Sequence, residues 1–207
     1  VGGVPIHVPV KREDYHPDLA ALQAHITPKT KAIVLNSPNN PTGAVYTREE
    51  TEAIVKMAVE HDLWILDDMI YSTLVWSDGG YTSPCEFDGG PERTITIGGW
   101  SKGWAMTGWR LGWITASPKI MDGVKKINVS SATHVATFLM PAAEIALGLS
   151  EEIDKMNDSF RARRTVAHEA FSSLPGIVVP KPEGAFYILC DITGTGMTDM
   201  EFATKAL

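Results

Sequence analysis

Residues Thr94–Trp113 read TITIGGWSKGWAMTGWRLGW and combine a strand signal with a reactive side chain. The run Thr94–Ile97 is entirely β-branched, which is typical of a strand. Gly98 and Gly99 follow, where a backbone turn is easier than with bulkier residues. Lys102 comes next, and a partly desolvated lysine has a lowered pKa and becomes a nucleophile. The stretch therefore predicts a strand that ends at a lysine-bearing turn.

The composition is ordinary for a globular protein. The chain has 207 residues, of which 44% are hydrophobic and 21% charged, enough for a sizeable core. Its net charge is −7 and it has no basic cluster, so we expect neither nucleic acid nor a membrane as partner. Cys85 and Cys190 lie far apart without metal-ligand spacing. We therefore expect no metal site and a reducing, cytoplasmic location.

The segments before the lysine turn alternate between strand and helix patterns. Lys31–Asn36 (KAIVLN) is a short apolar run, typical of a parallel strand buried on both faces. Thr47–Glu50 matches a capping box that begins a helix, although we expect Glu49 and Glu50 on its solvated face. Leu63–Leu66 (LWIL) is a second apolar run. This order predicts a βαβ unit.

The remaining elements are predicted from the same signals. Further strands are expected at Val4–Val10, Leu111–Ala116, Ile177–Val179 and Ala185–Asp191. Further helices are expected at Pro17–Ile26, Pro118–Val129, Thr133–Leu149, Ser150–Leu174 with Ser150 as its cap, and Asp199–Leu207. We predict an α/β fold with a mixed, mostly parallel sheet flanked by helices. Residues 1–150 would be part of a large domain, and residues 151–207 a linking helix and part of a small α+β domain.

Polar side chains follow three of the predicted strands, where ligands of open α/β sheets bind. They offer an amide, a carboxylate, a phenol, an amine and a guanidinium, from Asn40, Asp68, Tyr71, Lys102 and Arg110. This set suits a flat, phosphorylated, electron-poor ring that carries an aldehyde. Lysine would form an imine, the carboxylate would hold a ring nitrogen protonated, and arginine would bind phosphate. These properties describe pyridoxal 5'-phosphate.

Four motifs resemble those of the class I and II aminotransferases. They are SPNNPTG at residues 37–43, Asp-x-x-Tyr at 68–71, SKGWAMTGWRLGW at 101–113 and PEGAFY at 182–187. They occur in the family's order and cover nearly the whole chain. The resemblance implies an aspartate-aminotransferase-like, fold-type-I pyridoxal phosphate enzyme. Such an enzyme moves an amino group between an L-amino acid and a 2-oxo acid, and it is a homodimer.

The resemblance also implies roles for individual residues. Lys102 corresponds to the lysine that forms the Schiff base, and Asp68 to the partner of the ring nitrogen. Tyr71 and Asn40 correspond to residues on the phenolic oxygen of the ring, and Asn40 also to a contact of the substrate carboxylate. Catalysis would depend on Lys102, Asp68 and Tyr71. Two further residues correspond to phosphate binders, Ser101 and Arg110.

The chain departs from the family pattern in several places. Gly99 stands where some members carry a phosphate-binding serine. We do not find the family's N-terminal phosphate loop, its ring-stacking aromatic or its C-terminal arginine for the substrate carboxylate. We therefore expect an internal fragment of an aminotransferase, whose activity on its own is an open question.

Two other functions stay open at this point. Residues 99–103 match the Gly-x-Ser-x-Gly elbow of α/β-hydrolases, with Ser101 as nucleophile, and Asp154 or Asp158 followed by His168 would complete a triad. Those candidates share one predicted helix, which disfavours a triad. The other possibility is a non-catalytic protein that keeps the pyridoxal phosphate fold. Locally, Asp68 is also consistent with a helix cap.

Overall fold

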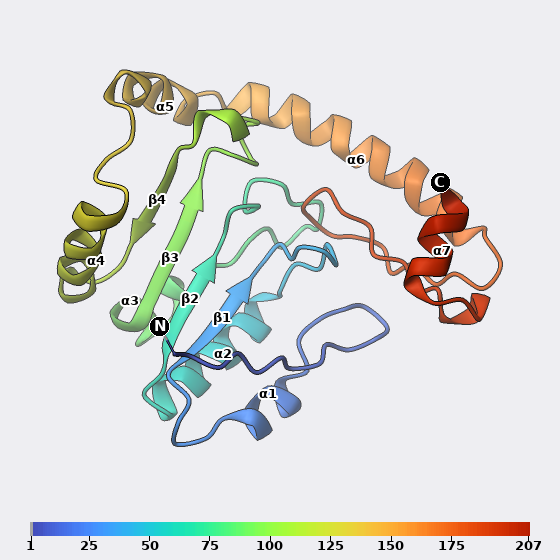
Figure 1. Cartoon of the computed structure of the whole chain (residues 1–207), viewed down its shortest axis with the longest axis horizontal. Coiled ribbons are helices and arrows are strands. Elements are labelled where there is room, and N and C mark those ends of the chain that lie inside the picture. Colours follow the sequence, from blue (N-terminus) through green and yellow to red (C-terminus); the bar gives the residue numbers. More distant parts are fainter. Residues whose placement is uncertain (1) are drawn as a thin grey trace.

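A four-stranded sheet forms the centre of the computed structural model, which describes residues 2–207 (Figure 1). The strands lie in the order β1 (Ala32–Asn36), β2 (Trp64–Asp68), β3 (Thr94–Gly99) and β4 (Gly112–Thr115). The first three strands are parallel, and β4 pairs antiparallel with β3. The prediction of a mixed, mostly parallel α/β sheet flanked by helices is confirmed.

Helix α2 (Arg48–Glu60) connects β1 to β2 and confirms the predicted strand–helix–strand unit. The Thr47 hydroxyl accepts from the Glu50 N–H, and the Glu50 carboxylate accepts from the Thr47 N–H, so the capping box is present. Ile54 and Val55 of α2 pack on the sheet, and α1 (Leu19–His25), capped by Asp18, joins the same core. This packing covers one face of β1 and β2.

The expectation that β1 is buried on both faces is wrong. Ile33 and Leu35 are buried against α2, but Val34 between them is 70% exposed. Alternate side chains of a strand point to opposite faces, and in residues 2–207 only one face of β1 is covered by a helix.

Gly98 and Gly99 do not form the sharp turn that the sequence indicated, because both residues still belong to β3. Glycine is needed here for a different reason. A Cβ on Gly98 would lie 2.3 Å from Cζ2 of Trp113, whose ring packs across from β4. The chain can turn only after Gly99, where the segment that carries Lys102 begins.

The second half of the chain is mainly helical. Its helices are α4 (Pro118–Ser131), α5 (Met140–Leu147), α6 (Ser150–Ser172) and α7 (Asp199–Ala206). The short helix α3 (Gly90–Arg93) precedes β3, and single 3-10 turns occupy Pro84–Glu86, Thr107–Trp109, Thr137–Leu139 and Thr193–Thr195. Figure 1 shows α6 running along one side of the molecule from α5 toward α7.

Three predicted strands are not formed in the described residues. Val4–Val10 contributes only an isolated bridge between Val10 and Pro17, since Pro5 and Pro9 lack N–H donors for a ladder. Ile177–Val179 and Ala185–Asp191 share only the bridge between Val178 and Asp191. Ala185 has a φ of 56°, a left-handed conformation that a strand excludes.

The predicted bounds of two helices and one strand also need correction. The helix expected from Thr133 begins at Met140, because Thr133 has a φ of 61° and Pro141 favours a first turn at that later position. Ser150 is the first residue of α6, and its N-cap is Leu149. The strand expected at Leu111–Ala116 is limited to β4, which is two residues shorter, because its pairing with β3 ends at Thr115.

Candidate active site

The carboxyl ends of the three parallel strands lie side by side. Asn36 at the end of β1 is in register with Asp68 at the end of β2, and Asp68 with Ile97 of β3. The Asn36 side-chain amide donates to the Asp68 carbonyl at 3.2 Å, and the Met69 N–H donates to the Ile97 carbonyl at 3.0 Å. The loops that follow these strands therefore start from one edge of the sheet.

A chain of polar groups links the first two loops. The Asn40 N–H donates to the Asn36 side chain at 2.7 Å, which fixes the loop after β1. The Asn40 amide in turn lies 3.5 Å from the Tyr71 hydroxyl, and the hydroxyls of Tyr71 and Tyr187 form a hydrogen bond of 2.7 Å. Burial and the Tyr187 hydrogen bond raise the pKa of Tyr71, so its phenol stays protonated.

Lys102 lies against the aromatic side of this group. Its Nζ is 6.0 Å from the centroid of the Tyr71 ring and 5.7 Å from that of the Phe186 ring, within reach of a cation–π interaction. The turn around Lys102 also approaches the loop after β2 closely. A Cβ on Gly103 would lie 2.0 Å from the Thr73 hydroxyl. Lys102 and Tyr71 are thus brought together, as the sequence predicted.

Asp68 is half-buried and its carboxylate accepts from the Ile70 N–H at 3.3 Å. It does not cap a helix, because residues 70–73 form turns. The neighbouring Asp67 points into the opposite face, is 1% exposed and accepts a 2.5 Å hydrogen bond from the Tyr81 hydroxyl. The two adjacent carboxylates therefore have different surroundings, and Asp68 is the one available to a ligand.

Ser101 and Arg110 are connected through a residue that the sequence analysis missed. The Thr107 hydroxyl donates to the Ser101 carbonyl at 2.6 Å, and the Arg110 guanidinium donates to the Thr107 carbonyl at 2.8 Å. Arg110 is exposed and adopts a left-handed conformation with a φ of 55°. Among residues 2–207, no hydrogen-bond partner occupies the Ser101 hydroxyl, and Arg110 donates only to Thr107, so both can bind an anion.

The sequence analysis also missed Phe186 and Tyr187. Both belong to the PEGAFY segment, which was recognised as a motif without any role for its aromatic residues. The Tyr71 ring lies edge-to-face with both rings, with centroid distances of 5.4 and 5.7 Å. The two adjacent aromatic residues of this motif, Phe186 and Tyr187, were the feature of the sequence that could have indicated a contribution to the site.

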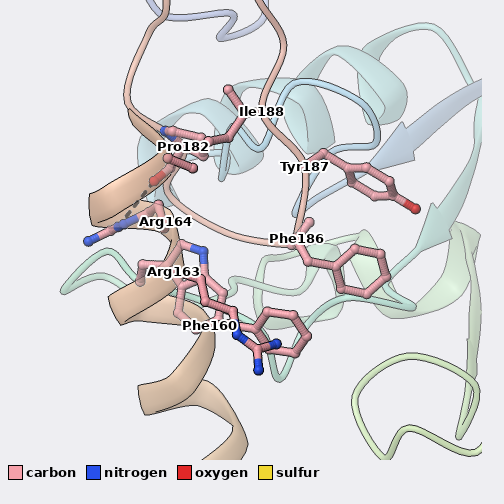
Figure 2. Close-up of a pocket in the computed structure, with 10 residues that line it drawn as sticks. Phe160, Arg163, Arg164, Pro182, Phe186, Tyr187 and Ile188 are labelled. Carbon is pink, nitrogen blue, oxygen red and sulfur yellow. Dashed lines mark hydrogen bonds between the residues drawn. The ribbon is translucent and has the colours of Figure 1, made fainter. Parts of the chain in front are cut away.

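A cavity of about 180 Å³ adjoins the site on the side of α6. Figure 2 shows Phe160, Arg163 and Arg164 of α6 facing the segment that carries Phe186 and Tyr187. The Arg164 guanidinium donates to the Pro182 carbonyl at 3.1 Å, drawn as the dashed line in Figure 2. Burial is the main reason why the pKa of Arg164 is lowered.

The geometry disfavours a hydrolase triad. His168 hydrogen bonds to the Val179 carbonyl at 3.1 Å and lies 3.5 Å from the Ser172 hydroxyl. Within residues 2–207, Ser101 forms no side-chain hydrogen bond with His168, Asp154 or Asp158. The same part of the chain holds no cluster of His, Cys, Asp or Glu side chains suited to a metal ion. None of its helices is long and apolar enough to cross a membrane.

Comparison with known proteins shows the family to which the chain belongs. The model of the family described as aminotransferase class I and II matches residues 1–207. The chain belongs to this family. It is 38% identical over 206 residues to aromatic-amino-acid aminotransferase 2 of Thermococcus litoralis, covering 98% of this chain and 53% of that protein. It is also 38% identical to aspartate aminotransferase of Pyrococcus abyssi, over 100% of this chain and 54% of the relative.

Solved structures of other aminotransferases have the same fold. The aromatic aminotransferase from Pyrococcus horikoshii matches with a TM-score of 0.93 and 37% identity, over 98% of this chain and 55% of that one. The aspartate aminotransferase from Thermus thermophilus with maleate matches with a TM-score of 0.84 and 34% identity, over 93% of this chain and 50% of that one. This aminotransferase chain therefore spans about half the length of the relatives it matches.

Proposed function

We propose that the protein moves an amino group between an L-amino acid and a 2-oxo acid with pyridoxal phosphate as cofactor. The observation that supports this most strongly is the gathering of four different groups at one edge of the sheet. An amine (Lys102), a carboxylate (Asp68), a phenol (Tyr71) and an amide (Asn40) follow three adjacent strand ends. Membership of the class I and II aminotransferases supports the same reaction.

The chemistry of these side chains fits pyridoxal phosphate. The half-buried Asp68 carboxylate suits a protonated ring nitrogen, because a charge-assisted hydrogen bond is stronger than a neutral one. Tyr71 keeps its proton and, with the Asn40 amide, offers donors to a ring oxygen. Ser101 and Arg110 offer a hydroxyl and a guanidinium to a phosphate. When bound, the cofactor supplies an electron-poor ring that stabilises negative charge at the substrate α-carbon.

Within this proposal each residue has a defined task. Lys102 would hold the cofactor covalently through Nζ, and as a free amine the same Nζ would take the proton from the substrate α-carbon. The protonated Lys102 amine would then serve as the general acid that returns this proton. Asp68 holds the proton on the ring nitrogen throughout, and Asn40 also contacts the substrate carboxylate. The Tyr71 and Phe186 rings flank Nζ on one side.

The proposal extends to the organisation of the protein. We place a domain division near residue 150, where α6 begins, and we assign a homodimer to the whole protein. Large apolar side chains are exposed on α4 and α5, among them Ile127 (71%) and Ile145 (67%), which supports association. The two free cysteines, Cys85 and Cys190, support a cytoplasmic location.

The assignment of Lys102 is tested by trapping the cofactor. We expect added pyridoxal phosphate to give an absorbance band that borohydride fixes, and mass mapping to find the reduced cofactor on the Lys102 peptide. Lys102→Ala should remove this label and lower transamination by at least about 100-fold, since it removes both the anchor and the general base.

Lys119→Ala is the matched control, because Lys119 is an exposed lysine of α4. This variant should keep both the label and the activity. Labelling scattered over several lysines, with no loss in Lys102→Ala, would contradict the assignment.

A further inference from the structure

A buried charge cluster lies behind the active site and is not used by the proposed reaction. His16 is 7% exposed, its Nδ1 is 2.7 Å from the Glu50 carboxylate, and its Nε2 is 2.9 Å from the Glu183 carboxylate. These two hydrogen bonds raise the pKa of His16 to about 10, so the imidazole is a cation that donates from both nitrogens. Lys11, 3.8 Å from Glu50, is the other nearby cation.

Both carboxylates are tied to the backbone as well. Glu50 accepts from the Thr47 N–H at the start of α2, and Glu183 accepts from the Val45 N–H at 3.1 Å. The N–H groups of Glu183 and Gly184 both donate to the Gly43 carbonyl at 2.9 Å. The cluster thus connects three segments: the N-terminal part of the chain, the loop that carries Asn40, and PEGAFY.

The PEGAFY segment leads directly from this cluster to the reactive groups. Gly184 approaches the Asn40 loop so closely that a Cβ would lie 2.7 Å from Pro38. Ala185 is fully buried and donates its N–H to the Leu74 carbonyl at 2.8 Å. Two residues later the Tyr187 hydroxyl meets the Tyr71 hydroxyl at 2.7 Å. Only three residues lie between Glu183, whose carboxylate is held by His16, and Tyr187, whose phenol contacts the site.

We propose that His16 is a positioning residue, which by bridging Glu50 and Glu183 holds residues 183–187 where Tyr187 bonds to the phenol of Tyr71. The functional meaning of this link rests on the proposed role of Tyr71 in cofactor binding. A second contact ties the N-terminal part of the chain to the residues just after this segment: the Arg12 guanidinium donates to the Asp191 carboxylate at 2.8 Å through Nε. His16 then acts on the site at a distance, without contact to the reacting atoms.

Nuclear magnetic resonance of tyrosine labelled with carbon-13 at Cζ tests this link without cofactor. The Tyr71 and Tyr187 resonances are assigned from Tyr71→Phe and Tyr187→Phe. In His16→Gln, which keeps a donor but loses the charge, we expect the Tyr71 resonance to move most of the way to its position in Tyr187→Phe. Ile65→Val is the control, because it weakens the buried core at a residue of β2 that takes no part in the cluster's hydrogen bonds, and its Tyr71 resonance should not move.

A folded His16→Gln with an unshifted Tyr71 resonance would overturn the proposal. If His16→Gln does not fold, Glu183→Gln removes one arm of the cluster and should give the same shift. An unshifted resonance in folded Glu183→Gln overturns the proposal equally. Trapping of the cofactor on Lys102 is measured on the unsubstituted protein, so failure of the proposed function is recognised separately from failure of this link.

Discussion

At the scale of single residues, two adjacent aspartates have different roles because only one of them is fully buried. Asp68 keeps an accessible carboxylate, whereas Asp67 is buried on the other face and bonded to Tyr81. Burial, with the charge of Asp68 adding to it, raises the pKa of Asp67 from 3.8 to about 6. The ionised Asp67 therefore opposes folding at neutral pH, although the Tyr81 and Thr96 hydrogen bonds reduce the effect.

Asp67→Asn is expected to stabilise the protein at neutral and alkaline pH. Because the folded pKa lies above the unfolded one, the native state binds more protons between pH 3.8 and about 6, and stability falls as the pH rises through this window. At pH 8 the variant should therefore gain about 1–3 kcal/mol in unfolding free energy, and little at pH 4. Urea denaturation at the two pH values measures this difference.

The control for this variant is Asp78→Asn, on an exposed loop, which should leave the pH profile unchanged. Destabilisation of Asp67→Asn at pH 8 would mean that the Tyr81 hydrogen bond to a charged carboxylate outweighs the cost of burial.

At the scale of elements, the chain contains two helices with the same cap and very different surroundings. Thr47 and Glu50 form a capping box on α2, and Thr198 and Glu201 form one on α7. Helix α2 buries Ile54, Val55 and Ala58 against the sheet, whereas α7 has no buried residue. A cap contributes to global stability only where loss of its helix also exposes core.

Thr47→Ala should therefore lower the unfolding free energy by about 1–2 kcal/mol, because the Glu50 N–H at the start of α2 loses its hydroxyl acceptor. Thr198→Ala should lower it by less than about 0.5 kcal/mol, since α7 can fray without global unfolding. Urea denaturation of both variants gives the comparison. Equal losses would show that α7 unfolds together with the sheet.

The element scale also shows what the sequence could reveal of the fold. The helix at Thr47 and the strands at Lys31–Asn36, Leu63–Leu66 and Thr94–Ile97 were predicted because their signals are local. The strand predicted at Ala185–Asp191 was wrong, because an alternating pattern does not reveal a left-handed residue.

At the scale of the whole molecule, the His16 cluster joins segments from both ends of the chain and makes the stability of the protein depend on pH. The hydrogen bonds that His16 donates to Glu183 and Glu50 raise the pKa of His16 from 6.5 to about 10. Its stabilisation is fully present below pH 6.5 and is lost as the pH rises through about 10. The two carboxylates act in the acid range. The His16 hydrogen bond lowers the pKa of Glu183. Burial is the largest single effect on Glu50 and opposes this change, but the hydrogen bonds from His16 and the Thr47 N–H, together with the nearby positive charges, lower its pKa overall.

The unfolding free energy should consequently fall between pH 7 and pH 10 by on the order of 2–4 kcal/mol from this cluster. His16→Gln should be less stable at pH 7, and its unfolding free energy should lack this decrease between pH 7 and pH 10. His25→Gln, at an exposed histidine of α1, is the control and should keep it. Urea denaturation measures the unfolding free energy at each pH. If it changes with pH in the same way in His16→Gln and in the unsubstituted protein, His16 is not charged in the native state.

The sequence by itself determined the family and the residues that follow the strand ends. Asn40, Asp68, Tyr71 and Lys102 were found because each belongs to a short motif beside a strand signal, and parallel strands bring such ends together. Their roles remain predictions for the experiments above.

Only the tertiary structure decided which distant groups support them. The partner of Tyr71 is Tyr187, 116 residues away, and the second partner of His16 is Glu183, 167 residues away. Glu50, expected on a solvated helix face, is buried with His16. Periodicity reports which side of an element is apolar. It carries no information about which polar groups meet when separate elements pack. Here the packing of distant segments holds both the Tyr71 phenol at the site and the His16 cluster behind it.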